Sequence, residues 1–220
     1  MPASPATRVW IVLAVLYGIF FLWYTSLRGP LTPDEIESYV ATLRDADLPE
    51  ERLAVWIRFM ESDTGDDFAM LNAIDLRATP APVPGVEPGE SSEEVLARYS
   101  RPFLGRAMRG AAHPVLLGRA AAPAVDVWGI DGASEWTNGG VVRYRSRRDV
   151  MEQAAALARM GEDNVHAFKI AAMEKTIAYP LDPWFHLGDP RLLLALVFAV
   201  IGLAVQAGAA SRRERAAEPA

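Results

Sequence analysis

The sequence predicts a mixed α+β domain held between two membrane-spanning helices. The prediction rests on an uncharged apolar run near each end of the 220-residue chain and on helix and strand patterns that alternate between the runs. The runs, residues 9–27 and 192–210, are 19 residues long and carry no charged side chain. At about 1.5 Å per residue, each can span the roughly 30 Å hydrocarbon core of a bilayer.

The flanks of the two runs predict retained anchors with both chain ends in the cytoplasm. The first run is longer than the apolar core of a signal peptide and ends without a small-x-small cleavage pattern. The alternative for the second, a buried core helix, is disfavoured by the arginines that follow at once. Under the positive-inside rule, Arg8 in residues 1–8 and Arg212 in the tail 211–220 face the cytoplasm. We therefore expect a two-span protein of the cell inner membrane, embedded in the lipid bilayer, with a periplasmic or extracellular central domain.

Residues 28–65 predict a pair of amphipathic helices. Thr32 and Glu35 have the spacing of a capping box, with Pro33 at the first helical position. Residues 47–50 have the spacing of a second box, and apolar residues recur at helical spacing after each. The pair either stands between the membrane and the main domain or belongs to the core of that domain, because the pattern fits both.

Residues 66–183 alternate between strand and helix patterns. Residues 68–76 predict a buried strand, and the four prolines and two glycines of residues 78–90 predict an extended, solvated loop. A helix from Ser91 to about residue 109 follows, with Pro102 expected to kink or restart it. Further strands are predicted at 115–119, 124–130, 141–145 and 168–179, with a turn at 138–140, a helix capped by 146–149 and a strand end at Pro180. The composition of the last strand suits a helix equally well.

We interpret this order of elements as the β-α-β-β-α-β of a ferredoxin-like domain, with one predicted strand more than that unit requires. Its two helices cover one face of an antiparallel sheet and leave the other face in need of a cover. The usual cover is a second copy of the chain, so a homodimer is expected. Residues 184–191 then form an interfacial segment before the second span.

Three short motifs resemble the dimeric α/β-barrel superfamily. They are FAMLN at residues 68–72, G-x-x-H-P-V-x-x-x-G-R at residues 110–119 and V-x-Y-x-S-R-x-D at residues 142–149. The resemblance spans about residues 66–180 and is closest to the small, uncharacterised ferredoxin-like members. It implies sheet-to-sheet pairing into a barrel, in which some members bind a small ligand. The superfamily includes monooxygenases, isomerases and haem-handling enzymes, and its members are typically soluble, so the two spans and the helical pair depart from its pattern.

Composition excludes several classes of function. Residues 29–190 carry 16 Lys and Arg against 26 Asp and Glu, a balance that repels nucleic acid. The absence of cysteine removes disulfides, thiol catalysis and cysteine metal sites. The three histidines lack metal-ligand spacing, and neither a phosphate-binding glycine loop nor a Gly-x-Ser-x-Gly elbow occurs. We therefore expect no metal, no cofactor and no nucleic-acid partner.

Four residues form the candidate pocket: Asn72, His113, Tyr144 and Lys175. His113 precedes a proline at the start of a strand, where it is either a proton carrier or bonded to the backbone. Lys175 lies in the last predicted strand, where a charge on a buried face would require a partner.

Arg143, Arg145 and Arg147 form the candidate anion-binding group. In a strand these alternate residues share one face, where they could grip a carboxylate or phosphate. Alternatively they neutralise nearby acids such as Asp149, Glu152 and Glu174 in this acidic domain.

These observations predict a non-enzymatic integral membrane protein that presents an extracytoplasmic ferredoxin-like domain to a membrane protein partner or a small ligand. The alternative is a membrane-anchored enzyme of the dimeric α/β-barrel type, monooxygenase- or isomerase-like, that uses the candidate pocket.

Overall fold

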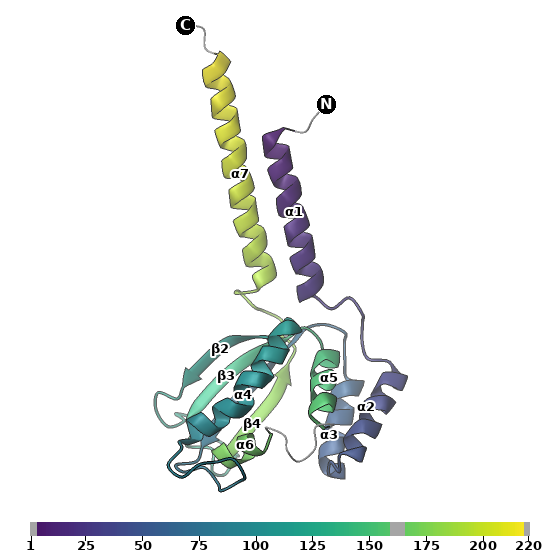
Figure 1. Cartoon of the computed structure of the whole chain (residues 1–220), viewed down its shortest axis with the longest axis vertical. Helices are drawn as coiled ribbons and strands as arrows, with labels where there is room; N and C mark the ends of the chain where they lie inside the picture. The colour runs from purple at the N-terminus through teal and green to yellow at the C-terminus, as the bar shows by residue number, and fades with distance from the viewer. Residues whose placement is uncertain (1–3, 159–165, 218–220) are drawn as a thin grey trace. The chain divides into compact units, whose positions relative to one another are not determined.

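The protein is mixed α+β, as the sequence predicts. A computed structural model describes residues 4–158 and 166–217, and in this part it contains seven helices and a four-stranded antiparallel sheet (Figure 1). The chain divides into two compact units. One is the domain Ser26–Pro183, and the other is made by the segments on either side of it.

Two apolar helices make up the second unit. α1 (Pro5–Tyr24) and residues Pro190–Arg212 of α7 (Pro190–Ala217) have mean hydropathies of 1.9 and 2.4 and are long enough to cross a membrane. Only 6% of the most apolar 18-residue stretch of each helix is buried inside the protein, which disfavours the core helix of a soluble protein. They pack antiparallel: Trp10 Nε1 donates to Gln206 Oε1 at 3.2 Å, and the Arg191 guanidinium lies 5.5 Å from the Tyr24 ring centre.

The helical pair at the start of the domain consists of α2 (Pro33–Asp45) and α3 (Glu50–Glu61). The capping box before α2 is confirmed: the Glu35 amide donates to Thr32 Oγ1 at 3.3 Å, and the Thr32 amide donates to Glu35 Oε2 at 2.9 Å. The box predicted at residues 47–50 is wrong. Pro49 is the residue before α3 and provides no side-chain cap, while Asp47 has a positive φ of 54° in the connecting turn.

This pair belongs to the core of the domain. Buried Leu43 of α2 and Leu53 and Met60 of α3 form one cluster with Met151 of α5 (Arg147–Ala158). Arg148, at the start of α5, donates to both oxygens of Glu35 at 2.8 and 2.9 Å. Of the two interpretations of residues 28–65, the structure favours packing against the domain.

The sheet has the strand order β2-β3-β1-β4 with every neighbouring pair antiparallel. The strands are β1 (Phe68–Leu76), β2 (His113–Arg119), β3 (Asn138–Tyr144) and β4 (Met173–Leu181). Phe68 pairs with Tyr144, and these side chains lie on what we call the first face. Ala69 pairs with Arg143 and Leu181, which lie on the second face, because successive side chains in a strand alternate.

Helices cover the first face. α4 (Ser92–Arg109) lies across the sheet in Figure 1, and side chains of α5 and α6 (His166–Ala172) pack into the same layer. The α4 helix is continuous through Pro102 and begins with the capping box of Ser91 and Glu94. A core cluster joins this layer to the sheet: Phe68, Ala107, Ala112, Val142 and Tyr144, with Phe59, Met70, Phe103 and Val150 against it.

Several local predictions are wrong. Residues 138–140 begin β3 rather than form a turn, since Gly139 and Gly140 pair with β1. Residues 124–130, predicted as a strand, lie in an exposed loop without strand pairing. The segment 168–172 belongs to α6, which continues directly into β4. Pro180 does not end β4, because an edge strand tolerates a residue without an N–H on its outer side.

The proline-rich segment is not a fully solvated loop. It has neither helix nor strand between residues 78 and 90, as expected. However, the Ala81 amide donates to the Ala171 carbonyl at 2.9 Å, and Val83 and Val86 pack against the buried cluster of Val95 and its neighbours in α6. The segment therefore closes the end of the helical layer.

Candidate functional site

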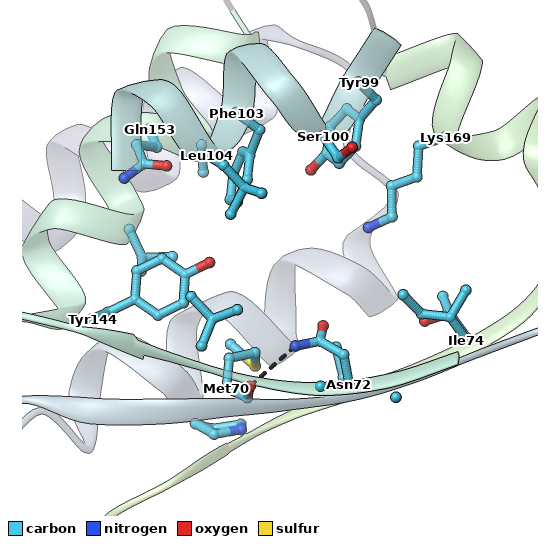
Figure 2. Close-up of a pocket in the computed structure, with 18 of the residues that line it drawn as sticks. Met70, Asn72, Ile74, Tyr99, Ser100, Phe103, Leu104, Tyr144, Gln153 and Lys169 are labelled. Carbon is cyan, nitrogen blue, oxygen red and sulfur yellow. Dashed lines mark hydrogen bonds between the residues drawn. The ribbon is translucent and has the colours of Figure 1, made fainter. Parts of the chain in front are cut away.

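A cavity of about 1220 Å³ lies between the first face of the sheet and the helices above it (Figure 2). Met70, Asn72 and Ile74 of β1 line its floor because alternate residues of a strand face the same side. Val142 and Tyr144 of β3 continue the floor. Residues of α3, α4, α5 and α6 form the opposite wall, so all layers of the domain contribute.

The α4 helix supplies an apolar and aromatic wall. Its lining residues recur at helical spacing and therefore share one face: Leu96, Tyr99, Ser100, Phe103 and Leu104. The rings of Tyr99 and Phe103 stack with their centres 5.5 Å apart. This wall is apolar except for the hydroxyl groups of Tyr99 and Ser100.

Uncharged polar groups lie among the apolar side chains that line the cavity. The Asn72 side-chain nitrogen donates to the Met70 carbonyl at 3.0 Å, and its side-chain oxygen is directed into the cavity (Figure 2). Burial raises the pKa of both Tyr99 and Tyr144, so each phenol stays protonated at neutral pH and can donate a hydrogen bond. These groups can orient a ligand without carrying charge.

The side-chain oxygen of Gln153 on α5 is buried without a hydrogen-bond partner in the described part of the chain. Gln153 lines the cavity at the end near Tyr144 (Figure 2). An unpartnered buried acceptor costs on the order of 1–3 kcal/mol, so it invites a donor from a ligand or water.

Lys169 of α6 points into the cavity from the other end (Figure 2) and is one of several cationic residues that line it. Burial, and then the positive charge of Arg52 on α3, lower its pKa. The pKa of nearby His166 is lowered by burial, by Lys169 and by Arg52. The cavity is therefore unfavourable for uncompensated positive charge at this end.

The four predicted pocket residues do not come together. Asn72 and Tyr144 line the cavity, whereas His113 and Lys175 lie on the second face of the sheet. The reason is strand register: His113 pairs with Arg143 and Lys175 with Asp75, and both positions alternate with the cavity-facing ones. The prediction of one shared pocket is wrong for this pair.

His113 and Lys175 both have interaction partners outside the cavity. His113 Nδ1 lies 3.1 Å from the Pro114 carbonyl oxygen, which agrees with the backbone-bonded interpretation. Lys175 Nζ lies 3.6 Å from Asp75 Oδ2, donates to the Gly132 carbonyl and sits 4.9 Å from the Trp136 ring centre. Lys175 thus has the charge partner that its position requires.

The candidate anion-binding arginines do not share a strand face, because β3 ends at Tyr144. Arg143 donates to Asp67 Oδ2 at 2.9 Å, and Arg145 Nε donates to Asp149 Oδ2 at 2.9 Å. Arg147 belongs to α5, where it donates to the Phe59 carbonyl at 2.6 Å and lies 3.8 Å from Asp63. These ion pairs agree with the alternative in which the arginines neutralise acids.

Lys169 and Gln153 were missed by sequence reasoning for different reasons. Lys169 lies in the segment predicted as a strand, and only its place in α6 directs it into the cavity. Gln153 lies on the predicted helix of α5, but a single glutamine on a helix carries no distinguishing pattern. Within the described residues, no three His, Asp or Glu side chains gather as a metal site.

Comparison with known proteins adds little. No protein-family model and no curated protein matches the chain. The crystal structure of the methylated RPA0582 protein is similar at 21% identity over 62% of this chain and 93% of that one, with a TM-score of 0.47. A structure of RPA0582, a protein of unknown function from Rhodopseudomonas palustris, is similar at 20% identity over 60% and 94%, with a TM-score of 0.45.

Proposed function

We propose that this chain is a membrane-anchored binding protein whose domain takes a small, largely apolar molecule into the cavity beneath α4. The observation that carries the proposal is the cavity itself, about 1220 Å³ between the sheet and the helices. Ligand sites are typically concave, roughly 300–1,000 Å³, mostly apolar and furnished with a few polar groups. The aromatic wall of α4 and the isolated polar groups of Asn72 and Gln153 fit that description.

The proposed framework is a ferredoxin-like domain of the dimeric α/β-barrel type. The strand order β2-β3-β1-β4 and the two helical crossings on one face support it. Exposed apolar side chains on the second face, among them Leu116, Ile177 and Tyr179, support pairing with a second copy. A membrane protein partner is the other candidate for that face.

The proposed setting is the inner membrane, with both chain ends in the cytoplasm and the domain outside it. The two apolar helices and the arginines at their outer ends support this orientation. A reporter that is active only in the cytoplasm, fused after Ala220, is expected to be active in intact cells. Activity only of an export-dependent reporter at that position would reverse the orientation.

The alternative function, an enzyme, would use the same cavity. Asn72 and the protonated phenol of Tyr144 supply an acceptor and a donor on the cavity floor, which favours a role for them in orienting a reacting group. The two functions are distinguished by the fate of the bound molecule. A binding protein releases it chemically unchanged, whereas an enzyme converts it.

Decanol, a neutral straight-chain probe, tests the binding proposal. We expect saturable heat of binding when decanol is titrated into the full-length protein in nanodiscs, after subtraction of a titration into empty discs. Ser100→Phe, which fills the α4 wall, should weaken binding by about tenfold or more, because the cavity loses volume and a desolvated contact surface.

Met108→Phe is the matched control, since Met108 is on the same helix but is 56% exposed and lies outside the cavity lining. It should bind decanol as the wild type does. Absence of saturable binding to the wild type, or equal loss in both variants, would contradict the proposed function.

A further inference from the structure

Cations outnumber acids along the cavity. Among the described residues that line it, five are cationic and one is acidic: Arg52, Arg58, Arg119, Arg147 and Lys169 against Asp182. Two of these cations are already paired: Arg147 lies 3.4 Å from Asp182 and 3.8 Å from Asp63, and Arg119 lies 3.0 Å from Glu93. Arg52, Arg58 and Lys169 are left without an ion pair among the described residues. Residues 29–190 as a whole have the opposite balance, with 16 Lys and Arg against 26 Asp and Glu. The cavity is therefore a positive site within an acidic domain, which favours an anionic ligand.

Lys169 is placed to meet that anion. Its side chain points into the cavity from α6 (Figure 2), with Nζ 5.5 Å from the centre of the Tyr99 ring. It forms no ion pair with any residue in 4–158 or 166–217. Arg52, an exposed residue of α3 that also lines the cavity, adds a second positive charge close enough to lower the pKa of Lys169. A desolvated ammonium group without a carboxylate is unfavourable, and an anionic ligand supplies the missing partner.

The end of the cavity opposite Lys169 favours a hydrogen-bond donor on the ligand rather than a negative charge. Gln153 lies at the opposite end from Lys169 in Figure 2, and its buried side-chain oxygen accepts no hydrogen bond from the described residues. Between these two ends the wall is apolar, with Phe103 and Leu104 facing the floor residue Met70 (Figure 2).

We propose that the ligand is an elongated amphipathic carboxylate with a hydrogen-bond donor, such as a hydroxyl, at its far end. The carboxylate pairs with Lys169, the apolar body lies along α4, and the donor faces Gln153. A singly charged head group matches Lys169, the one lysine among the described residues that line the cavity. This inference rests on the proposed function, because it names the class of molecule that the same cavity takes.

Decanoate and decanol test the charge, because they share a chain length and differ in the head group. In titrations of the full-length protein in nanodiscs at neutral pH, decanoate should bind about tenfold more tightly than decanol, as a charge-assisted hydrogen bond requires. Lys169→Met should abolish this preference and leave decanol binding in place, which also shows that the variant is folded. Lys175→Met, which removes a lysine from the second face, should keep the preference.

A third probe, 10-hydroxydecanoate, tests the far end. It should bind about threefold more tightly than decanoate. Gln153→Leu should remove this additional affinity and leave the affinity for decanoate unchanged. Equal binding of decanoate and decanol, or a preference that survives Lys169→Met, would overturn the carboxylate inference while the proposed function stands. Failure of all three probes to bind would instead overturn the proposed function.

Discussion

Glu35 and Arg148 show how single side chains tie the helical pair to the sheet domain. Arg148 is buried and donates to both oxygens of Glu35, and also to the carbonyls of Gly29 and Pro30 at 3.1 and 3.0 Å. Glu35 at the same time caps α2 through Thr32. One guanidinium therefore joins α5, the start of α2 and the segment that leads into the domain, and it leaves few of its donors unused.

This arrangement predicts a specific acid sensitivity. The hydrogen bonds from Arg148 and then from the Thr32 backbone lower the pKa of Glu35 from 4.5 to about 2. Because the folded pKa lies below the unfolded one, the stabilisation is complete above pH 4.5 and is lost as the pH falls from 4.5 toward 2. Glu35→Gln should lower the melting temperature at pH 7 and reduce its decline across that window, measured by circular dichroism of the full chain in detergent.

Glu37→Gln serves as the control for this prediction, since Glu37 is exposed on the same helix. It should leave both the melting temperature at pH 7 and the acid decline close to those of the wild type. An unchanged acid decline in Glu35→Gln would show that other carboxylates dominate.

At the scale of elements, the packing of α1 against α7 depends on one glycine. A Cβ at Gly202 would come within 2.4 Å of Cζ2 of Trp10, whose indole is held by its hydrogen bond to Gln206. Gly208, six positions later on the same helix, has nothing within 4 Å of its Cβ position. Small residues let membrane helices approach closely, so Gly202 rather than Gly208 sets this contact.

Gly202→Ala should therefore destabilise the helix pair by about 1–3 kcal/mol, the usual cost of overpacking. Gly208→Ala, the matched substitution, should be neutral or slightly stabilising because alanine has the higher helix propensity. Thermal unfolding of the two variants in the same detergent measures the difference. Equal behaviour of both would mean that α1 and α7 do not pack through Gly202.

The type of a helix or strand could be predicted where residues close in the sequence determine it. The predictions failed where contacts with residues distant in the sequence determine it. The Thr32 capping box and the strand at residues 68–76 depend on local sequence, and both are confirmed, although only Phe68 and Ala69 of that strand are buried. Gly139 and Gly140 look like a turn, yet pairing with β1 keeps them in a strand. The segment 168–172 suits helix and strand equally in composition, and its packing under α4 selects the helix.

The candidate site was only half predictable for the same reason. Asn72 and Tyr144 line the cavity, but whether a strand residue faces the helices or the second face depends on register, which a one-residue shift reverses. The sequence of the last strand offers no reference for register, and Lys175, which was grouped with Asn72 and Tyr144, lies on the opposite face of the sheet from them. The direction of Lys169 could not be predicted, because it depends on the boundary between α6 and β4, and residues 168–179 were predicted as one strand.

At the scale of the whole molecule, the two faces of the sheet differ: helices cover the first face, and the second face exposes apolar side chains. The first face carries the cavity and its helices. On the second face Leu116 is 64% exposed and Tyr179 is 45% exposed, from strands at opposite edges of the sheet. Exposed apolar side chains spread across a sheet face are a common mark of an interaction surface. A second copy bound to this face would leave the cavity on the first face free for a ligand.

A second copy on this face is testable through Tyr179. Tyr179→Glu places a charge within the proposed interface and should weaken self-association by about tenfold or more, since aromatic anchors dominate interface energies. Met108→Glu introduces the same charge at an exposed apolar position on α4, away from that face, and should leave association unchanged. Sedimentation velocity of the full chain in density-matched detergent measures both. A monomeric wild type at micromolar concentration would contradict the homodimer, and capture of a different membrane protein that Tyr179→Glu releases would assign the face to that partner.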